Sequence, residues 1–330
     1  MSRDVNNKYW DEELETLPRE ELEKRQLADL KEIVQLAYDH APYYKRSFDA
    51  AGVKPSDIKT LKDIQKFPFI DKKTQRDTQG VGSFLGELAA VPEEDVVFVS
   101  TSSGSTGELG GSIEATRKAI EDLWGAEVYD FYGLSDIFGA CAAMCEAKDG
   151  LHIAENHILV ETVDIHTGEA LEPGQVGELV FTTLRKHARP LIRFRTGDIG
   201  WIDNTPCSCG RTHGRIHISG RKDDMFIVSA VNVFPSDIEA VIRELSGITG
   251  EYLIRVFERD FTCKYSVEIE KNSDNPATDE AVAAEVSAAL KARIGVKPYS
   301  VVVHPDGGLN TRSEHKAKRI IDERKLDYSI

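Results

Sequence analysis

The chain has 330 residues, with 41 lysines and arginines against 56 aspartates and glutamates, so its formal net charge at pH 7 is −15. This length is enough for two domains with real cores, and 41% hydrophobic with 29% charged residues is a globular composition, which excludes disordered and fibrous proteins. The acidic balance without a basic run excludes non-specific nucleic-acid binding, and no apolar run reaches the ~18 residues of a membrane span.

The amino-terminal segment and the cysteines both favour the cytoplasm. Residues 1–25 are charged and contain no apolar stretch of the kind found in a secretory signal. The five cysteines are an odd and sparse set, so we expect reduced thiols and no disulfide framework. A reducing cytoplasm is the compartment that this cysteine content indicates.

In the first part of the chain, apolar spacing and turn residues predict helices followed by strands. The expected elements are helices over 20–38, 56–65 and 116–124 and strands over 95–101 and 127–132. Residues 156–201 then alternate short β-rich segments with turns that contain Gly and Pro.

The last third of the chain has a different pattern. Its expected elements are a helix over 236–245, strands over 252–257 and 263–269, a helix over 279–294 and a strand over 299–303. This α-β-β-α-β order predicts a small α+β module, and we expect the seam between the two parts near residues 220–224.

A cluster of small polar residues, Thr101–Gly107, directly follows a predicted strand. Its glycines let backbone N–H groups turn inward and its hydroxyls add donors, an arrangement that can surround phosphate oxygens. No Gly-Lys-Ser or Gly-Lys-Thr follows, so it is not a Walker loop. From the residues alone, a plain surface loop is the alternative.

Two later turns carry residues suited to a nucleotide. In the segment Tyr132-Gly-Leu-Ser-Asp136, the ring could stack on a purine and the carboxylate could hold Mg²⁺. The alternative is an ordinary turn with a helix-capping side chain. In Arg193–Asp198, the carboxylate of Asp198 could accept both ribose hydroxyls, or the segment could be a surface turn with an ion pair.

Nine stretches in order make the chain resemble the AMP-forming adenylating superfamily of acyl-CoA synthetases, and it looks most like the phenylacetate–CoA ligase family. They are YWDEELETL, HAPYYKRSFDAAGV, TSSGSTG, DFYGLSD, GELVFTTL, RPLIRFRTGD, GRKDDMFIV, VNVFPSDIE and RSEHKAKRI, which span residues 9–320. The resemblance implies a shortened α/β adenylating-enzyme fold, with a large nucleotide-binding N-terminal domain over 1–221 and a small mobile α+β C-terminal domain over 222–330.

The resemblance also implies which residues bind ATP or AMP. The residues expected to grip the β- and γ-phosphates are Ser102, Ser103, Gly104, Ser105, Thr106 and Gly107. Tyr132 would stack near adenine, with Gly133 and Ser135 beside it in the same motif. Asp136, where the family usually has Glu, would bind Mg²⁺ or lie on the α-phosphate side.

Four more positions match functional residues of the family. Asp198 would hold the ribose hydroxyls and Arg221 would contact ribose or phosphate. Asp223 matches the hinge about which the C-terminal domain rotates between two half-reactions. Lys316 matches the mobile lysine that stabilises charge during adenylation, which suits a phosphoryl chemistry that depends on positioning and cations. Without the resemblance, Lys316 would be interpreted as a solvated lysine at a basic helix start.

The sequence departs from the family in three places. Only 24 residues separate Gly107 from Tyr132, where the family has several βα units of roughly 30 residues each. The chain is therefore internally shortened between about 108 and 112, and much of the expected acyl pocket is missing. Ala230 stands where the family usually has Gly beside the pantetheine tunnel, and His315 replaces the Gly before the lysine.

Four cysteine and histidine residues form a candidate metal site. Cys207 and Cys209 lie on a tight C-x-C turn, and Cys145 and His152 lie upstream. Family members that carry this turn tend to carry the upstream pair too, and four such ligands suit a structural Zn²⁺ ion. Reduced, buried thiols are the alternative, and Cys141 and His213 are alternative ligands.

The leading interpretation is an ATP-dependent ligase that activates an aryl or related carboxylate as an acyl-adenylate and transfers it to coenzyme A. A catalytically weak or inactive relative that binds nucleotide or a partner is the main alternative, because the acyl pocket is largely deleted. An adenylating enzyme that loads another acceptor is a third. The expected partners are the small carboxylate and CoA, without nucleic acid or membrane. A homodimer is also expected to cover apolar surface left by the deletion.

Overall fold

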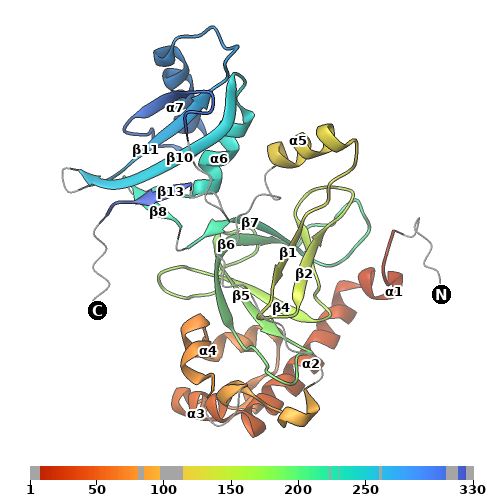
Figure 1. Ribbon diagram of the computed structural model, residues 1–330. Helices are drawn as coiled ribbons and strands as arrows, with labels where there is room; N and C mark the ends of the chain where they lie inside the picture. The colour runs from red at the N-terminus through yellow and green to blue at the C-terminus, as the bar shows by residue number, and fades with distance from the viewer. Residues whose placement is uncertain are drawn as a thin grey trace. The chain divides into compact units, whose positions relative to one another are not determined.

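The computed structural model describes residues 8–80, 85–96, 114–222, 224–229, 231–259, 262–309 and 319–324. The chain divides into two compact units, the first formed by 1–107 with 129–218 and the second by 108–128 with 219–330. Figure 1 shows the elements of both units along the chain. The segment around residue 120 thus groups with the C-terminal part, and the boundary expected between residues 221 and 222 stays a prediction.

The first unit begins with helices. They are α1 (Glu12–Glu15), α2 (Arg19–His40), α3 (Pro42–Ala51) and α4 (Lys72–Thr78), with 3₁₀ turns η1 (Pro55–Asp57), η2 (Leu61–Lys66), η3 (Gly86–Leu88) and η4 (Glu93–Asp95). The helix predicted over 20–38 is confirmed as α2. The helix predicted over 56–65 was wrong in form, because the Asp63 carboxylate accepts the N–H groups of Lys59 and Thr60 and starts a new turn there.

A seven-stranded sheet forms the rest of the first unit. Its strands, in spatial order, are β1 (Phe131–Leu134), β2 (Gly139–Met144), β3 (Leu151–Ile153), β7 (Arg215–Arg221), β6 (Phe194–Asp203), β5 (Gly177–Thr183) and β4 (Ile158–Val163). Strand β1 starts later than predicted, since the ladder with β2 begins at Phe131. The strand predicted over 95–101 falls largely outside the described residues.

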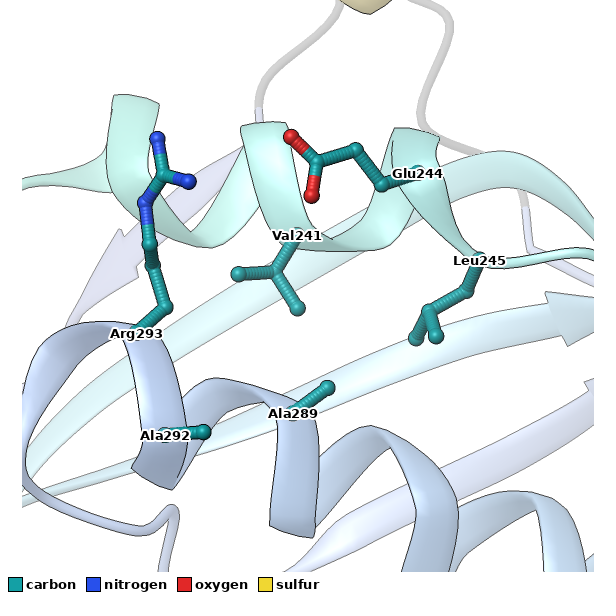
Figure 2. A pocket seen from close by; sticks show the side chains of 6 residues that line it. All are labelled: Val241, Glu244, Leu245, Ala289, Ala292 and Arg293. Atoms are coloured by element: carbon teal, nitrogen blue, oxygen red, sulfur yellow. The ribbon is translucent and has the colours of Figure 1, made fainter.

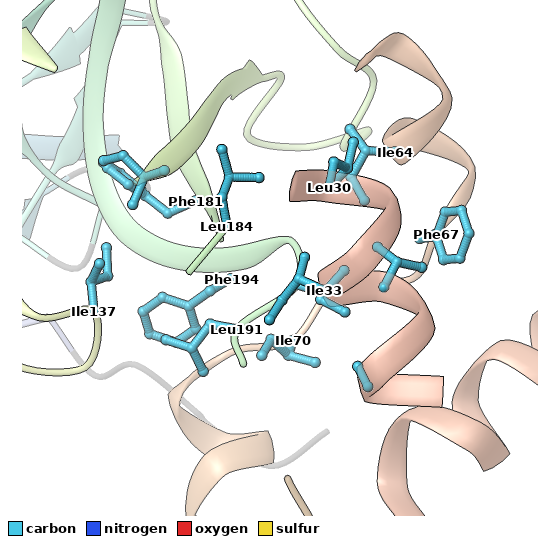
Figure 3. Packing of buried hydrophobic residues seen from close by; sticks show 14 of the residues in the cluster. Leu30, Ile33, Ile64, Phe67, Ile70, Ile137, Phe181, Leu184, Leu191 and Phe194 are labelled. Atoms are coloured by element: carbon cyan, nitrogen blue, oxygen red, sulfur yellow. The ribbon is translucent and has the colours of Figure 1, made fainter. Parts of the chain in front are cut away.

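The core of this unit lies between the sheet and the helices. Figure 3 shows Ile33 of α2 beside Phe194 of β6 and Leu191, all fully buried. Burying side chains of this size contributes roughly 1.5–3 kcal/mol each. The packed sheet therefore holds the site residues on its strands in fixed positions.

Arg193 joins the sheet to the segment between η2 and α4. Its guanidinium pairs with the buried Glu161 carboxylate at 3.0 Å and donates to the carbonyl oxygens of Gln65 at 2.9 Å and Phe67 at 3.0 Å. It also lies 3.9 Å above the ring of Phe69. Arg193 has a φ of 51°, in the left-handed region, so these contacts hold the backbone in an unfavourable conformation.

The second unit contains a four-stranded sheet in the order β12-β11-β10-β13 and a β8–β9 hairpin. Its elements are α5 (Glu114–Trp124), β8 (Phe226–Val228), β9 (Val231–Val233), α6 (Pro235–Glu244), β10 (Ile248–Arg259), β11 (Thr262–Lys271), α7 (Asp279–Ile294), β12 (Val301–Pro305) and β13 (Ile320–Asp322). The predicted α-β-β-α-β order is confirmed in α6 to β12. In the described part of the chain, every helix is too short or too polar to cross a lipid bilayer.

Candidate functional site

Tyr132 and Asp198, both expected at the nucleotide, meet in the first unit. The Tyr132 hydroxyl, on β1, donates to the Asp198 carboxylate, on β6, at 2.5 Å. The Tyr132 ring stacks on Phe181 of β5, with 5.9 Å between ring centroids. Asp198 is only 5% exposed, and burial followed by its negative charge raises the pKa of the Tyr132 hydroxyl well above the ordinary value. The Asp198 carboxylate is therefore a buried hydrogen-bond acceptor that already binds the Tyr132 hydroxyl.

The two residues that follow Tyr132 shape the end of β1. Gly133 lies at a register shift in the β1–β2 ladder, where a Cβ atom would come within 2.4 Å of the Gly139 carbonyl oxygen. Glycine is therefore required there by close backbone approach. Ser135 lies in the turn that continues from β1 into Asp136.

Asp136 is held by two elements far from it in the sequence. Gln75 of α4 donates its side-chain amide to the Asp136 carboxylate at 3.2 Å, and the Lys186 ammonium donates to the Asp136 carbonyl oxygen. Arg189 donates to the side-chain oxygen of Gln75 at 2.9 Å. These contacts fix the turn after β1 and gather two cations beside a carboxylate, a combination that suits an anionic ligand.

Lys186, Arg189 and Gln75 were missed by the sequence analysis. Burial, and then repulsion from Arg189, lowers the pKa of the Lys186 ammonium to about 8. The segment Arg185-Lys-His-Ala-Arg189 has the composition of a solvated turn, so its sequence gives no signal of burial. The burial arises because α4 and residue Ala90 pack against this turn, Ala90 through a backbone hydrogen bond to Ala188.

Several predicted site residues cannot be compared with these. Ser102, Ser103, Gly104, Ser105, Thr106 and Gly107, together with Asp223, Ala230, His315 and Lys316, lie outside the described residues. Arg221 ends β7 and belongs to the second unit, where its carbonyl oxygen accepts the N–H groups of Asp224 and Met225. The roles given to these residues stay predictions.

The four candidate metal ligands come together at one end of the sheet. Cys145 follows β2, His152 lies on β3, and Cys207 and Cys209 lie on the turn between β6 and β7. Their ligand atoms all lie within 4.8 Å of one another, and three of the four residues are buried. The antiparallel pairing of β3 with both β2 and β7 is what brings the upstream pair to the turn.

The protonation chemistry of this cluster is set by its neighbours. The Nδ1 atom of His152 lies 2.9 Å from the His213 carbonyl oxygen, so it carries the proton and leaves Nε2 as the acceptor that faces the Cys209 sulfur at 3.3 Å. Burial lowers the pKa of His152, which favours the neutral ligand form.

The thiols of the cluster differ in pKa. Burial raises the pKa of the Cys145 thiol to about 12. At Cys209, burial raises the pKa of the thiol, but hydrogen bonds from Arg211 and contacts with the Cys207 and Cys145 thiols together lower it below the ordinary value. A metal ion would have to displace the thiol protons, as in other thiolate sites.

The alternative ligands do not reach this cluster. Cys141 is buried on β2, where burial raises its pKa to about 12, and it is not among the four converging residues. The His213 side chain is also outside the set, although its carbonyl oxygen orients His152. Cys145, His152, Cys207 and Cys209 are therefore the four residues that the geometry brings together.

An open hollow of about 290 Å³ lies between α6 and α7 of the second unit. Figure 2 shows Val241, Leu245 and Ala289 along it. Glu244 and Arg293 add opposite charges. None of the residues expected at the nucleotide or metal sites lines this hollow.

Comparison with known proteins gives the class. A family model described as the AMP-binding enzyme C-terminal domain matches residues 230–324. A crystal structure of 2-hydroxyisobutyryl-CoA ligase in the postadenylation state superposes with a TM-score of 0.88 at 22% identity, covering 98% of this chain and 94% of that chain. The chain therefore has the fold of the AMP-forming adenylating enzymes.

The chain is also similar to full-length enzymes over most of its sequence. A phenylacetate–coenzyme A ligase from Thermus thermophilus is 28% identical over an alignment that covers 95% of this chain and 99% of the relative. Ligases of the same name from Aromatoleum evansii and Escherichia coli are each 29% identical, with 95% of this chain and 97% of each relative covered. Over nearly its whole length the chain is therefore similar to phenylacetate–CoA ligases.

The same alignment bears on the length of the chain. The alignment with the Thermus relative runs over 446 positions, whereas this chain has 330 residues, so more than one hundred positions of the relative have no counterpart here. Shortening within the chain is thus a fact of the comparison. Its location between about 108 and 112 stays a prediction.

Proposed function

We propose that the protein is an ATP-dependent ligase that activates an aryl or related carboxylate and joins it to coenzyme A. The observation that carries this proposal is the buried Asp198 carboxylate, bonded to Tyr132 beneath the turn that holds Asp136, in a chain whose relatives are named phenylacetate–CoA ligases. ATP, Mg²⁺ and CoA are the cofactors and co-substrates of the proposed reaction.

The proposed chemistry has two steps. A carboxylate oxygen attacks the α-phosphorus of ATP, pyrophosphate leaves, and an acyl-adenylate forms. The thiolate of CoA then attacks the acyl carbon, and AMP leaves with the bonding electron pair. Both steps need positioning and charge neutralisation more than a protein nucleophile. Lys316 would supply the mobile positive charge in the first step, and Lys186 would fix the turn that carries Asp136.

A second candidate function rests on the shortened alignment. If the missing positions include most of the acyl pocket, the protein binds nucleotide but activates no carboxylate. Carboxylate-dependent exchange of labelled pyrophosphate into ATP, measured over a panel of aryl acids, separates the two. Exchange with any acid supports the ligase, whereas silence together with intact ATP binding supports the inactive relative.

We also propose that Cys145, His152, Cys207 and Cys209 hold a structural Zn²⁺ ion. Three thiolates and one neutral imidazole are ligands that zinc prefers, and four protein ligands leave no open position for substrate. The buried His152, with Nδ1 bonded to a carbonyl, fits this ligand set. Thiolate ligands persist in a reducing compartment, so a cytoplasmic location belongs to the same proposal.

A further inference from the structure

Residues 8–19, the strap, lie against the turn that carries Cys207 and Cys209. The Tyr9 hydroxyl donates to the carbonyl oxygen of Cys209 at 2.9 Å. Arg211 donates to the Lys8 carbonyl oxygen at 2.7 Å and to the Glu15 carboxylate at 2.6 Å. The candidate metal turn is thus bonded to the strap on both sides of Gly210.

Backbone contacts continue this attachment. The N–H group of Thr212 donates to the Glu15 carbonyl oxygen at 3.1 Å. The Glu155 carboxylate, 6% exposed, accepts both from Arg19 of the following helix at 2.6 Å and from the Gly214 N–H group at 2.7 Å. Charge-assisted bonds at low exposure are among the stronger hydrogen bonds in proteins.

Gly210 is adapted to the approach of the strap. It has a φ of +85°, which other residues rarely adopt, and its N–H group closes the turn on the Cys207 carbonyl oxygen at 3.0 Å. A Cβ atom at this position would come within 2.7 Å of the Tyr9 hydroxyl oxygen. The tight C-x-C turn and the Tyr9 contact therefore depend on the same residue.

The strap buries one apolar side chain, Leu17, which is 8% exposed. Helix α1, which makes up its middle, contains no buried residue, and Trp10 is 78% exposed. The polar contacts to residues 209–214 must therefore supply much of its attachment. Those contacts are favourable only while the turn keeps its conformation, because each donor and acceptor is placed by the turn backbone.

We propose that the metal ion held by Cys145, His152, Cys207 and Cys209 fastens the strap, so that metal loss releases residues 8–19. The inference rests on the proposed zinc site. Two of the four ligands lie on the turn, one lies on β3 and one directly follows β2, so the ion would tie the turn to these two strands. Since such coupling is reciprocal, release of the strap must weaken metal binding by the same factor.

Hydrogen–deuterium exchange on the full chain tests the fastening. Protein depleted of metal by a chelator under reducing conditions should exchange the amides of residues 8–19 at least about tenfold faster than zinc-loaded protein. Re-addition of zinc should restore protection, while amides of β10 and β11 in the second unit should not change. Metal loss with an unchanged exchange rate in the strap overturns the fastening but leaves the zinc site. A preparation that binds no zinc overturns both.

A double variant tests the reverse direction without touching a ligand. Tyr9→Phe with Glu15→Ala, which changes only the strap side of the contacts to Cys209 and Arg211, should free the strap in zinc-loaded protein and speed zinc transfer to a competing chelator by about tenfold. Tyr299→Phe, which removes a tyrosine hydroxyl bonded to Arg259 in the second unit, is the matched control and should change neither. A freed strap with unchanged zinc transfer contradicts the coupling, as does fast transfer with a protected strap.

Discussion

The polar residues around Asp198 and Asp136 and the cysteine cluster lie in the same unit, but they differ in how far their polar groups are already paired. Around Asp198 and Asp136, the polar groups are already paired with one another through Tyr132, Gln75 and Lys186. In the cysteine cluster, the four ligand atoms converge, and the sulfurs of Cys145 and Cys207 are 3.7 Å apart.

This difference affects what each cluster can bind. A ligand at Asp198 must share or replace an existing hydrogen bond, so its binding depends on the balance between two partners. An ion in the cysteine cluster would bind all four ligand atoms at once and replace only weak hydrogen bonds of the thiols. The first arrangement suits a substrate that comes and goes, and the second suits an ion that stays.

The largest expected effect tests the proposed nucleotide site. Lys316→Ala should lower adenylation by about 10²–10³-fold, because it removes the charge that stabilises the transition state. Thioester formation from supplied acyl-adenylate should stay nearly intact. Lys318→Ala, from the same basic segment, is the control. Equal loss of both half-reactions in Lys316→Ala would contradict the assigned role.

The next effect tests the cysteine cluster. Cys207→Ser should reduce bound zinc from one equivalent to near none and lower the free energy of unfolding by about 3 kcal/mol. Elemental analysis and thermal melts measure the two quantities. Cys263→Ser, a cysteine of the second unit, should keep both unchanged. Wild-type protein that contains no zinc after careful preparation would contradict the proposed zinc site.

A smaller change concerns the shared hydrogen bond. Asp198→Ala should weaken ATP or AMP binding by about 1–3 kcal/mol, the range for charge-assisted hydrogen bonds to a ligand. Isothermal calorimetry measures this, with Glu172→Ala, an exposed acidic residue before β5, as control. Unchanged affinity would take Asp198 out of the nucleotide site.

The smallest effect is a pH dependence from Lys186. Its pKa is about 8 when folded against an ordinary 10.5, so the unfolded chain binds the extra proton between these values. The free energy of unfolding must therefore rise with pH over this interval. The destabilisation caused by burying the Lys186 cation is fully present below pH 8. Relative to Lys186→Met, wild type should gain about 1–2 kcal/mol between pH 7.5 and 10.5, allowing for partial solvent access. Parallel urea-unfolding profiles of the two proteins would show that Lys186 is not buried as a cation.

The features that could be predicted from the sequence are those encoded by residues close together in the chain. Helix α2 and the order α6 to β12 follow from apolar spacing within each segment, so periodicity located them. The cysteine cluster could be anticipated because C-x-C is a short motif and because family members that carry this turn tend to carry the upstream Cys and His. The bonds of Gln75 and Lys186 to Asp136 could not, since they join residues 61 and 50 positions apart through packing that no short pattern encodes.

Arg193 has a consequence for how the first unit unfolds. Within the described residues, the Arg193 guanidinium is the ion-pair partner of the buried Glu161 carboxylate, and undocking of the helical segment would remove the bonds of Arg193 to the Gln65 and Phe67 carbonyl oxygens. Leaving the buried donors of a charged group without acceptors costs about 1–3 kcal/mol or more. Helices α2, α3 and α4 should therefore open together with the sheet as one cooperative unit, whereas the strap can open alone.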